Sequence, residues 1–128
     1  MAKTIIATDK APAAIGPYSQ GNEAAGFVYV SGQLPIDPAT GTIPEGIEAQ
    51  TKQALNNVKA IVEAAGGTMD DVIKTSCFLT NIGDFAAMNG IYKEFFSEGK
   101  YPARAALEVS KLPKPEAVVE IEAIAYIK

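Results

Sequence analysis

Arg104 is the residue whose type and setting most clearly indicate chemistry. It lies in the segment YPARAALEV, residues 101–109, where most of its neighbours are apolar. A guanidinium removed from water needs a partner, because burying an unpaired charge is costly. Its planar, parallel donors match a carboxylate group. We therefore predict that Arg104 binds a carboxylate, which belongs either to a ligand or, in an interface ion pair, to Glu108, Glu120 or Glu122.

The sequence lacks several common catalytic groups. It contains no histidine, so neither a Ser-His-Asp nor a Cys-His relay can form. Because it also has one cysteine, the usual zinc ligand sets cannot be assembled, and we expect no metal. No GxxxxGK[ST] or GxGxxG phosphate loop occurs, and we expect no cofactor. The chemistry must then rely on arginine, lysine, carboxylates, tyrosine, amides, hydroxyls, backbone groups and water.

Length and charge limit the class of protein and its partners. The 128 residues predict a single domain that spans residues 1–128. A net charge of −4 disfavours phosphate backbones, so nucleic acid is not an expected partner. No segment has the roughly 20 apolar residues of a membrane span, and we do not expect the first residues to form a signal peptide. The lone cysteine, Cys77, excludes an internal disulfide, favours a cytoplasmic location and is expected to be a small buried apolar residue.

The apolar spacing predicts two helices and five or six strands. Apolar residues three and four apart indicate helices over 46–65 and 84–97, and the aromatic stripe of the second helix is expected to pack in the core. Runs of β-branched and aromatic residues indicate strands over 3–8, 26–32, 71–80, 102–109 and 117–127. Segments with several prolines and glycines are expected to be loops, at 11–21 and 33–46.

These elements predict an α+β fold in which two helices cover one face of a sheet. In the last strand, alternate residues form an apolar face that suits the helices: Val119, Ile121, Ala123, Ala125 and Ile127. The other face mixes apolar and acidic residues, and such a face usually meets a partner. We therefore expect a homo-oligomer in which sheets pack together. The same alternation assigns both Arg104 and Glu120 to the face away from the helices.

A direct hairpin between the last two strands is disfavoured by charge. If the chain turned near Lys114, Glu108 would lie opposite Glu120. Like charges that face each other destabilise a strand pair. We therefore expect that another strand lies between these two.

Several segments, read in order, carry a resemblance to a known family. They are AIGPYSQG, YVSGQLPIDPATG, ALNNVKAIVEAAG, DFAAMNGIYKEFF and YPARAALEV…LPKPEAVVEIEA. Together they resemble the Rid family (reactive intermediate deaminase A, or YjgF), from about residue 11 to the C-terminus. The resemblance implies a chorismate-mutase-like fold: a mixed β-sheet with two helices on one face, assembled as a homotrimer with the sheets inside and three clefts between subunits. It also implies hydrolysis of 2-imino acids, such as 2-iminobutyrate and 2-iminopropionate, to 2-keto acids and ammonia.

The same resemblance implies catalytic residues. Arg104 matches the arginine that binds the substrate carboxylate. Glu120 matches the acidic residue near the attacking water, which it either deprotonates as a general base or orients. Glu122, on the same face, is the competing candidate, and Glu120 could instead be a solvated or interface carboxylate. Ala106 stands where many members carry a cysteine whose backbone N–H contacts the ligand. That backbone role can persist here, whereas thiol chemistry cannot.

Three further residues match the substrate-binding cleft of the family. Tyr18 and Asn89 match cleft side chains, and Gly32 matches a backbone contact to the ligand. Each also has a purely structural interpretation. Tyr18 could pack within its loop, Asn89 could be a surface amide of the second helix, and Gly32 could simply end a strand.

Two other functions stay open at this point. The first is a regulator that binds small carboxylates through the same arginine without turnover. The second is inhibition of translation or cleavage of RNA, which has been ascribed to members of the family. The acidic charge and the absence of a basic stripe disfavour contact with RNA.

Overall fold

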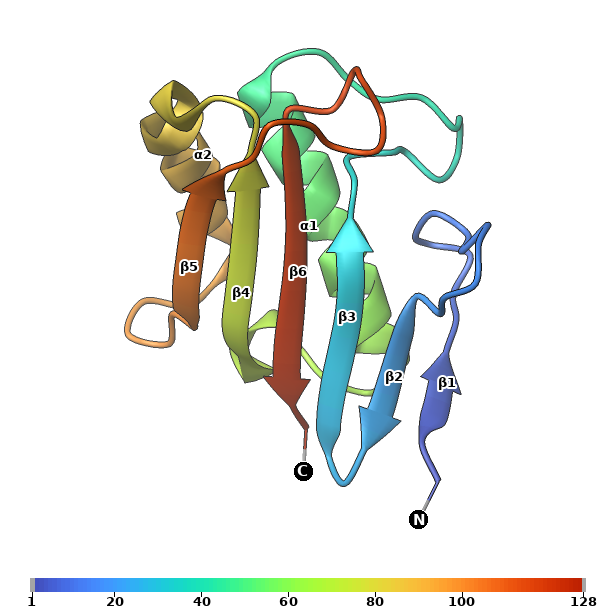
Figure 1. Cartoon of the computed structure of the whole chain (residues 1–128). Coiled ribbons are helices and arrows are strands. Elements are labelled where there is room, and N and C mark those ends of the chain that lie inside the picture. Colours follow the sequence, from blue (N-terminus) through green and yellow to red (C-terminus); the bar gives the residue numbers. More distant parts are fainter. Residues whose placement is uncertain (1, 128) are drawn as a thin grey trace.

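The strands of the chain join into one mixed sheet, and both α-helices pack against the same face of it (Figure 1). The computed structural model describes residues 2–127. Its strands are β1 (Thr4–Ile6), β2 (Gly21–Ala24), β3 (Phe27–Gln33), β4 (Val72–Leu79), β5 (Ala103–Glu108) and β6 (Val119–Tyr126). Its α-helices are α1 (Ile47–Ala64) and α2 (Phe85–Tyr92), and three short 3₁₀ turns are η1 (Met69–Asp71), η2 (Ile82–Asp84) and η3 (Lys93–Phe95). The predicted α+β class is confirmed.

The order of the strands confirms the separation of the last two. The sheet runs β1-β2-β3-β6-β4-β5, so β4 lies between β6 and β5. The pairing of β4 with β5 is parallel, and the other pairings are antiparallel. Glu108 is therefore paired with Leu79, and Glu120 with Phe78. The two carboxylates do not face each other across a ladder.

Strand β2 is the element that the sequence pattern did not predict. Its residues, GNEA, have low β-propensity, and the alternation of apolar residues is absent. It forms because Ala25 and Gly26 adopt positive φ values of 53° and 89°. A two-residue turn of this kind matches the twist of a hairpin and returns the chain onto β3.

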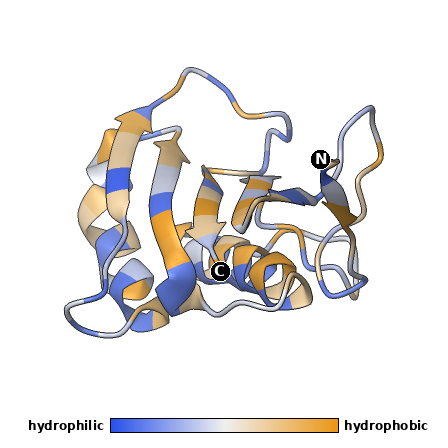
Figure 2. Ribbon diagram, turned by 90° about the horizontal axis from the view of Figure 1, so that it is seen from below, coloured by the Kyte–Doolittle hydropathy of each residue, from blue (hydrophilic) through white to orange (hydrophobic). Residues whose placement is uncertain are grey.

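The core lies between the sheet and helix α1. The helix buries an apolar stripe that includes Leu55, Val58 and Ile61. Facing it are the alternate residues of β6, among them Val119 and Ile121, which have no exposed surface. Fully burying one such side chain contributes about 1.5–3 kcal/mol. Figure 2 shows both helices on one side of the curved sheet, as the apolar face of the last strand predicted.

Helix α2 is shorter than its aromatic stripe predicted. The prediction extended over 84–97, whereas α2 ends at Tyr92 and tightens into η3. Phe96 then turns to extended backbone, and its ring packs on Tyr92 with 4.9 Å between ring centroids. The aromatic residues do pack against the core, as expected. Within residues 2–127, neither helix combines the length and apolar character needed to cross a bilayer.

The predicted orientation of Arg104 is wrong. Strand β5 pairs with β4 so that Arg104 lies beside Thr75, and Ala106 beside Cys77. Thr75 and Cys77 are fully buried on the helix side of the sheet, so Arg104 and Ala106 also face that side. The physical reason is that β5 is the edge strand, where helix α2 leaves room for a polar side chain. The apolar Leu107 instead faces the open side, where it is 43% exposed.

The open face of the sheet has the mixed character that its sequence predicted. Glu120 lies on this face, as expected, because it alternates with the buried residues of β6. Apolar side chains are also exposed there: Ile5, Phe27, Tyr29, Leu107 and Tyr126. The rings of Phe27 and Tyr126 lie 4.8 Å apart between centroids and form a small aromatic patch. No helix of the described residues covers this face (Figure 1).

Candidate active site

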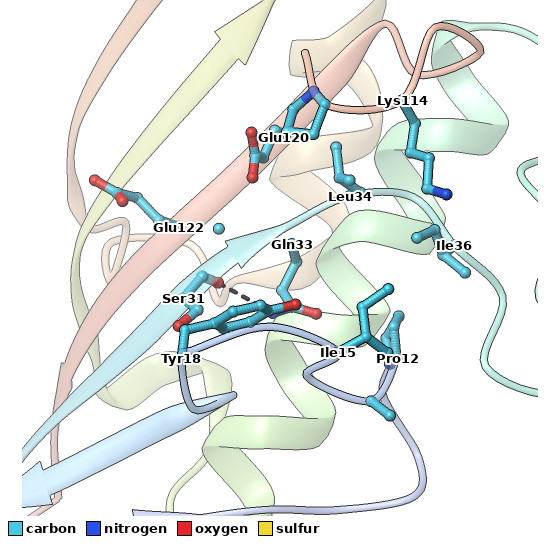
Figure 3. Close-up of a pocket in the computed structure, with 13 residues that line it drawn as sticks. Pro12, Ile15, Tyr18, Ser31, Gln33, Leu34, Ile36, Lys114, Glu120 and Glu122 are labelled. Carbon is cyan, nitrogen blue, oxygen red and sulfur yellow. Dashed lines mark hydrogen bonds between the residues drawn. The ribbon is translucent and has the colours of Figure 1, made fainter.

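A cleft of about 560 Å³ opens where the loop after β1, the end of β3 and the start of β6 meet. Figure 3 shows its side chains, which come from three separate segments of the chain. Its polar groups include Tyr18, Ser31 and Glu120, and Lys114 lies at its rim. Its apolar wall is formed by Ile15, Leu34 and Ile36, among others. The cleft thus combines a carboxylate with an apolar surface, as small-molecule sites commonly do.

Gly32 and Glu120 lie against each other in this cleft. The pairing of β3 with β6 is irregular between Val30 and Gln33, which brings Gly32 next to Glu120. A Cβ placed on Gly32 would lie 3.0 Å from Glu120 Cδ and closer still to its Oε2. Glycine suits this position because the carboxylate occupies the space that a side chain would fill, and a larger residue would displace that carboxylate.

The surroundings of Glu120 favour its protonated form. Burial raises the pKa of the Glu120 carboxyl, and the negative charge of Glu122 on the same strand raises that pKa further. A carboxylate with a raised pKa is a stronger base, better suited to take a proton from water near neutral pH. Of the two competing carboxylates, Glu120 is the half-buried one and Glu122 is exposed.

Tyr18 extends over the cleft from the loop between β1 and β2, with 53% of its surface exposed. Two contacts hold this loop to β3. The Ser31 hydroxyl donates to the carbonyl of Ser19 at 2.6 Å, and the Ser31 backbone N–H donates to the carbonyl of Gln20 at 3.0 Å. The buried Gln20 amide also donates to the carbonyl of Pro12 at 2.7 Å. These hydrogen bonds hold the loop that carries Tyr18 in place.

Two buried side-chain amides of α1 form hydrogen bonds with the backbone of the segments after β3 and before β6, which line the cleft. Asn57 Nδ2 donates to the carbonyls of Leu34 and Ile36, each at 3.0 Å. Gln50 accepts from the Val118 backbone N–H at 2.7 Å, just before β6 begins. Neither amide was predicted from the sequence to be a site residue. The sequence could have indicated them, because both lie within the apolar stripe of the helix, where a polar side chain needs buried hydrogen-bond partners.

Arg104 lies in a second group of residues, where β5 meets α2. Its Nη1 donates to Asn89 Oδ1 at 2.6 Å. Its Cζ lies 5.2 Å from the ring centroid of Phe85 and 4.8 Å from that of Tyr92. Arg104 is exposed, and a guanidinium has five N–H donors. One bond to Asn89 therefore leaves most of its donors available to a ligand carboxylate.

Ala106 contributes a backbone donor to the same edge. The Val109 N–H donates to the carbonyl of Leu79, toward β4. Successive N–H groups of a strand point to alternate sides, so the N–H of Ala106, three residues earlier, points away from β4. Since β5 is the last strand of the sheet, that N–H is directed to the open edge. Its position suits the backbone role that the resemblance implied.

The six predicted site residues therefore form two groups. Tyr18, Gly32 and Glu120 share the cleft on the open side of the sheet, and the second group, on the helix side, consists of Arg104, Asn89 and Ala106. The sheet separates the two groups, so one chain does not bring Arg104 and Glu120 together. Between residues 2 and 127, no three His, Cys, Asp or Glu side chains gather into a possible metal site.

Comparison with known proteins identifies the family. The family profile described as endoribonuclease L-PSP matches residues 8–127. The chain belongs to the Rid family. Among Rid proteins, it is 52% identical over 127 residues to the 2-iminobutanoate/2-iminopropanoate deaminase of Salmonella typhimurium, covering 98% of each chain. The identification made from the sequence segments is confirmed.

Solved structures of Rid proteins share the fold. The RidA structure from an Antarctic Psychrobacter superposes with a TM-score of 0.92 and 52% identity, covering 97% of this chain and 99% of that one. The structure of Escherichia coli TdcF with bound serine gives a TM-score of 0.93 and 47% identity, covering 98% and 99%. The mixed sheet with two helices is thus the fold of the family.

Proposed function

We propose that this Rid protein hydrolyses small 2-imino acids and their enamine tautomers, including 2-iminobutyrate and 2-iminopropionate, to 2-keto acids and ammonia. The observation that carries the proposal is the 52% identity, over nearly the whole of both chains, to the deaminase of Salmonella typhimurium. The chemistry needs no cofactor, because a protonated imine is already electrophilic. The enzyme has mainly to hold the substrate and position water.

Arg104 binds the substrate carboxylate in this proposal. Its exposed guanidinium, already held on one side by Asn89, offers parallel donors to two carboxylate oxygens. The N–H of Ala106, on the same open edge, adds a backbone donor. Together these groups fix the acid end of the substrate and leave C2 free for attack.

Glu120 acts on the water. It accepts a proton as the water oxygen forms a bond to C2 of the protonated imine, and this proton then passes to the nitrogen. As the C–N bond breaks, ammonia leaves with the bonding electrons, Glu120 takes the proton of the hydroxyl on C2, and C2 becomes the carbonyl carbon of the keto acid. That last proton leaves with the ammonia as ammonium. The raised pKa of Glu120 suits both steps, since the group must accept a proton and then release it. Gly32 and Tyr18 frame the same space.

The proposed active site is completed between subunits. Arg104 and Glu120 lie on opposite sides of one sheet, so a second copy has to bring its own group to each cleft. We propose the chorismate-mutase-like homotrimer of the resemblance, with the sheets inside and three clefts. The exposed apolar residues of the open face support this assembly, because apolar side chains left exposed on a sheet face are commonly buried by a partner. The proposed location is the cytoplasm.

Two other functions predict different behaviour. A regulator that binds small carboxylates would use Arg104 in the same way but release no ammonia. The description of the matching family names an endoribonuclease, yet the chain has no histidine and a net charge of −4, which disfavour RNA as a substrate. Neither nucleic acid nor a membrane is a proposed partner.

The test is ammonia release from 2-iminobutyrate generated in situ by a threonine dehydratase. The wild-type protein should accelerate ammonia release above the spontaneous rate. The Arg104→Ala variant should lose at least about two orders of magnitude in kcat/KM, because removing a charge-assisted bidentate contact costs roughly 3 kcal/mol. Binding of 2-ketobutyrate without ammonia release would favour the regulator. RNA cleavage that persists in Arg104→Ala would point to a different site.

A further inference from the structure

The guanidinium of Arg104 has no carboxylate partner among the acidic residues that the sequence offered as alternatives. Glu108, on the same face of β5, instead accepts a hydrogen bond from the Ile82 N–H at 2.9 Å. Glu120 lies on the other side of the sheet. The contacts of the guanidinium are instead with two aromatic rings and one amide.

A single hydrogen bond cannot fix a long side chain. The bond from Nη1 to Asn89 Oδ1, 2.6 Å long, leaves the guanidinium plane free to rotate about it. The rings of Phe85 and Tyr92, at 5.2 Å and 4.8 Å from Cζ, restrict that rotation. Both distances fall within the roughly 6 Å at which a cation is attracted to an aromatic face.

The Tyr92 ring is itself held in place by contacts with Thr75 and Phe96. Its hydroxyl and that of Thr75 share a buried hydrogen bond of 2.7 Å. Thr75 is the residue of β4 that pairs with Arg104 on β5, so the ring spans the space between α2 and the strand beside Arg104. Burial of the ring against Phe96 adds a second constraint.

Between residues 2 and 127 no carboxylate is buried, so none competes for the guanidinium inside the fold. Cys77 of β4 pairs with Ala106, which shares a face of β5 with Arg104. Burial raises the pKa of its thiol to about 11, so the thiol is neutral at physiological pH. The positive charge of Arg104 therefore stays available to a ligand.

We propose that Phe85 and Tyr92 are positioning residues, which hold the Arg104 guanidinium through their ring faces in the orientation that receives a ligand carboxylate, while the Thr75 hydroxyl fixes the Tyr92 ring. The identity of the ligand rests on the proposed function, whereas the aromatic support of Arg104 does not. The rings touch the arginine and not the reacting atoms, so their loss should weaken binding of the carboxylate more than it slows the chemical step.

The sharpest comparison is Phe85→Leu against Phe95→Leu. Both phenylalanines are half-buried and pack against the core from the same helical segment, but only Phe85 lies under Arg104. Phe85→Leu should raise KM for 2-iminobutyrate, and Kd for 2-ketobutyrate by calorimetry, about threefold to tenfold, with kcat within about twofold of wild type. Phe95→Leu should leave both unchanged, and Phe85→Tyr should restore both.

Tyr92→Phe and Thr75→Val test the hydrogen bond between the hydroxyls of Tyr92 and Thr75. Tyr92→Phe keeps the ring and removes the shared hydroxyl bond, as Thr75→Val does from the other side. Each should raise KM by about twofold to threefold. The double variant should raise KM no more than either single variant, because the two substitutions remove the same hydrogen bond. Additive increases, or a fall in kcat at unchanged KM, would contradict the role assigned to Thr75.

A double-mutant cycle separates this inference from the proposed function. Phe85→Leu is compared in the wild-type and Arg104→Ala backgrounds by the midpoint of urea unfolding, at one protein concentration. The inference predicts a larger shift in the wild-type background, whether or not the protein hydrolyses imines. Equal shifts in both backgrounds, together with equal KM values for Phe85→Leu and Phe95→Leu, would overturn it. Absence of imine hydrolysis in the wild type would overturn the proposed function alone.

Discussion

At the scale of single residues, the cleft depends on a glycine that makes room for a carboxylate. A Cβ on Gly32 would collide with the Glu120 carboxylate, which is the flexible end of a side chain and can move aside. Gly32→Ala should therefore fold with little loss of stability and lower kcat by at least about tenfold, because it would displace the proposed catalytic carboxylate and a misplaced catalytic group is costly. Gly90→Ala is the control, since a Cβ there meets nothing within 4 Å. Equal kcat values for the two variants, measured by ammonia release, would contradict the contact.

The interaction between Glu120 and Glu122 predicts a change in pH dependence. The charge of Glu122 helps to raise the pKa of Glu120, and a general base loses activity as pH falls through its pKa. Glu122→Gln removes that charge and so lowers the pKa of Glu120. The acidic limb of the kcat/KM profile should then move to lower pH, with activity at neutral pH kept. A limb that stays in place would mean that another group controls it.

The chemistry of these residues was easier to predict than their orientation. The types of Arg104 and Glu120, and the absence of histidine and of a second cysteine, limited the chemistry from the sequence. Alternation along a strand shows which residues share a face, but it does not show which face meets the helices. For β5 both faces contain small or apolar residues, and its position at the sheet edge is a tertiary property. The aromatic rings beneath Arg104 were expected only as core for the same reason.

At the scale of elements, helix α1 both fills the core and holds the segments around the cleft. Asn57 is fully buried and supports the backbone at Leu34 and Ile36. Asn57→Ala should lower the free energy of unfolding by about 1–3 kcal/mol, because two carbonyls lose their donor. Its exposed neighbour gives the control, and Asn56→Ala should stay within about 0.5 kcal/mol of wild type. Urea unfolding measures both, and equal losses would show that the amide bonds contribute nothing.

The helices and strands could be predicted from the sequence where the local spacing of apolar residues determines them. The helix over 46–65 was close to α1 because its apolar spacing extends through most of its length. Strand β2 was missed because its turn at Ala25 and Gly26, and its pairing with β3, create it. Helix α2 ended early because Phe96 packs on Tyr92 from an extended backbone. In both cases tertiary contacts override the local signal.

At the scale of the whole molecule, the fold places the proposed site residues of each chain in two separate groups. The cleft holds Glu120 on the open side of the sheet, and the β5 edge holds Arg104 on the helix side. A point-group assembly of identical chains can place the second half of one copy beside the first half of the next. The resemblance implied clefts between subunits, and the separation of the two groups supports the proposal that the site is completed by a second copy.

The most direct test of this account is complementation between two inactive variants. Arg104→Ala and Glu120→Gln chains are unfolded together in urea at equal amounts, refolded, and assayed for ammonia release from 2-iminobutyrate. In a ring of three, any mixed assembly contains one cleft with both groups intact. Because three quarters of randomly formed trimers are mixed, the mixture should regain about one quarter of the wild-type activity. Each variant refolded alone should stay near background. A mixture that also stays at background, while native mass spectrometry shows that mixed trimers have formed, would contradict a site shared between subunits.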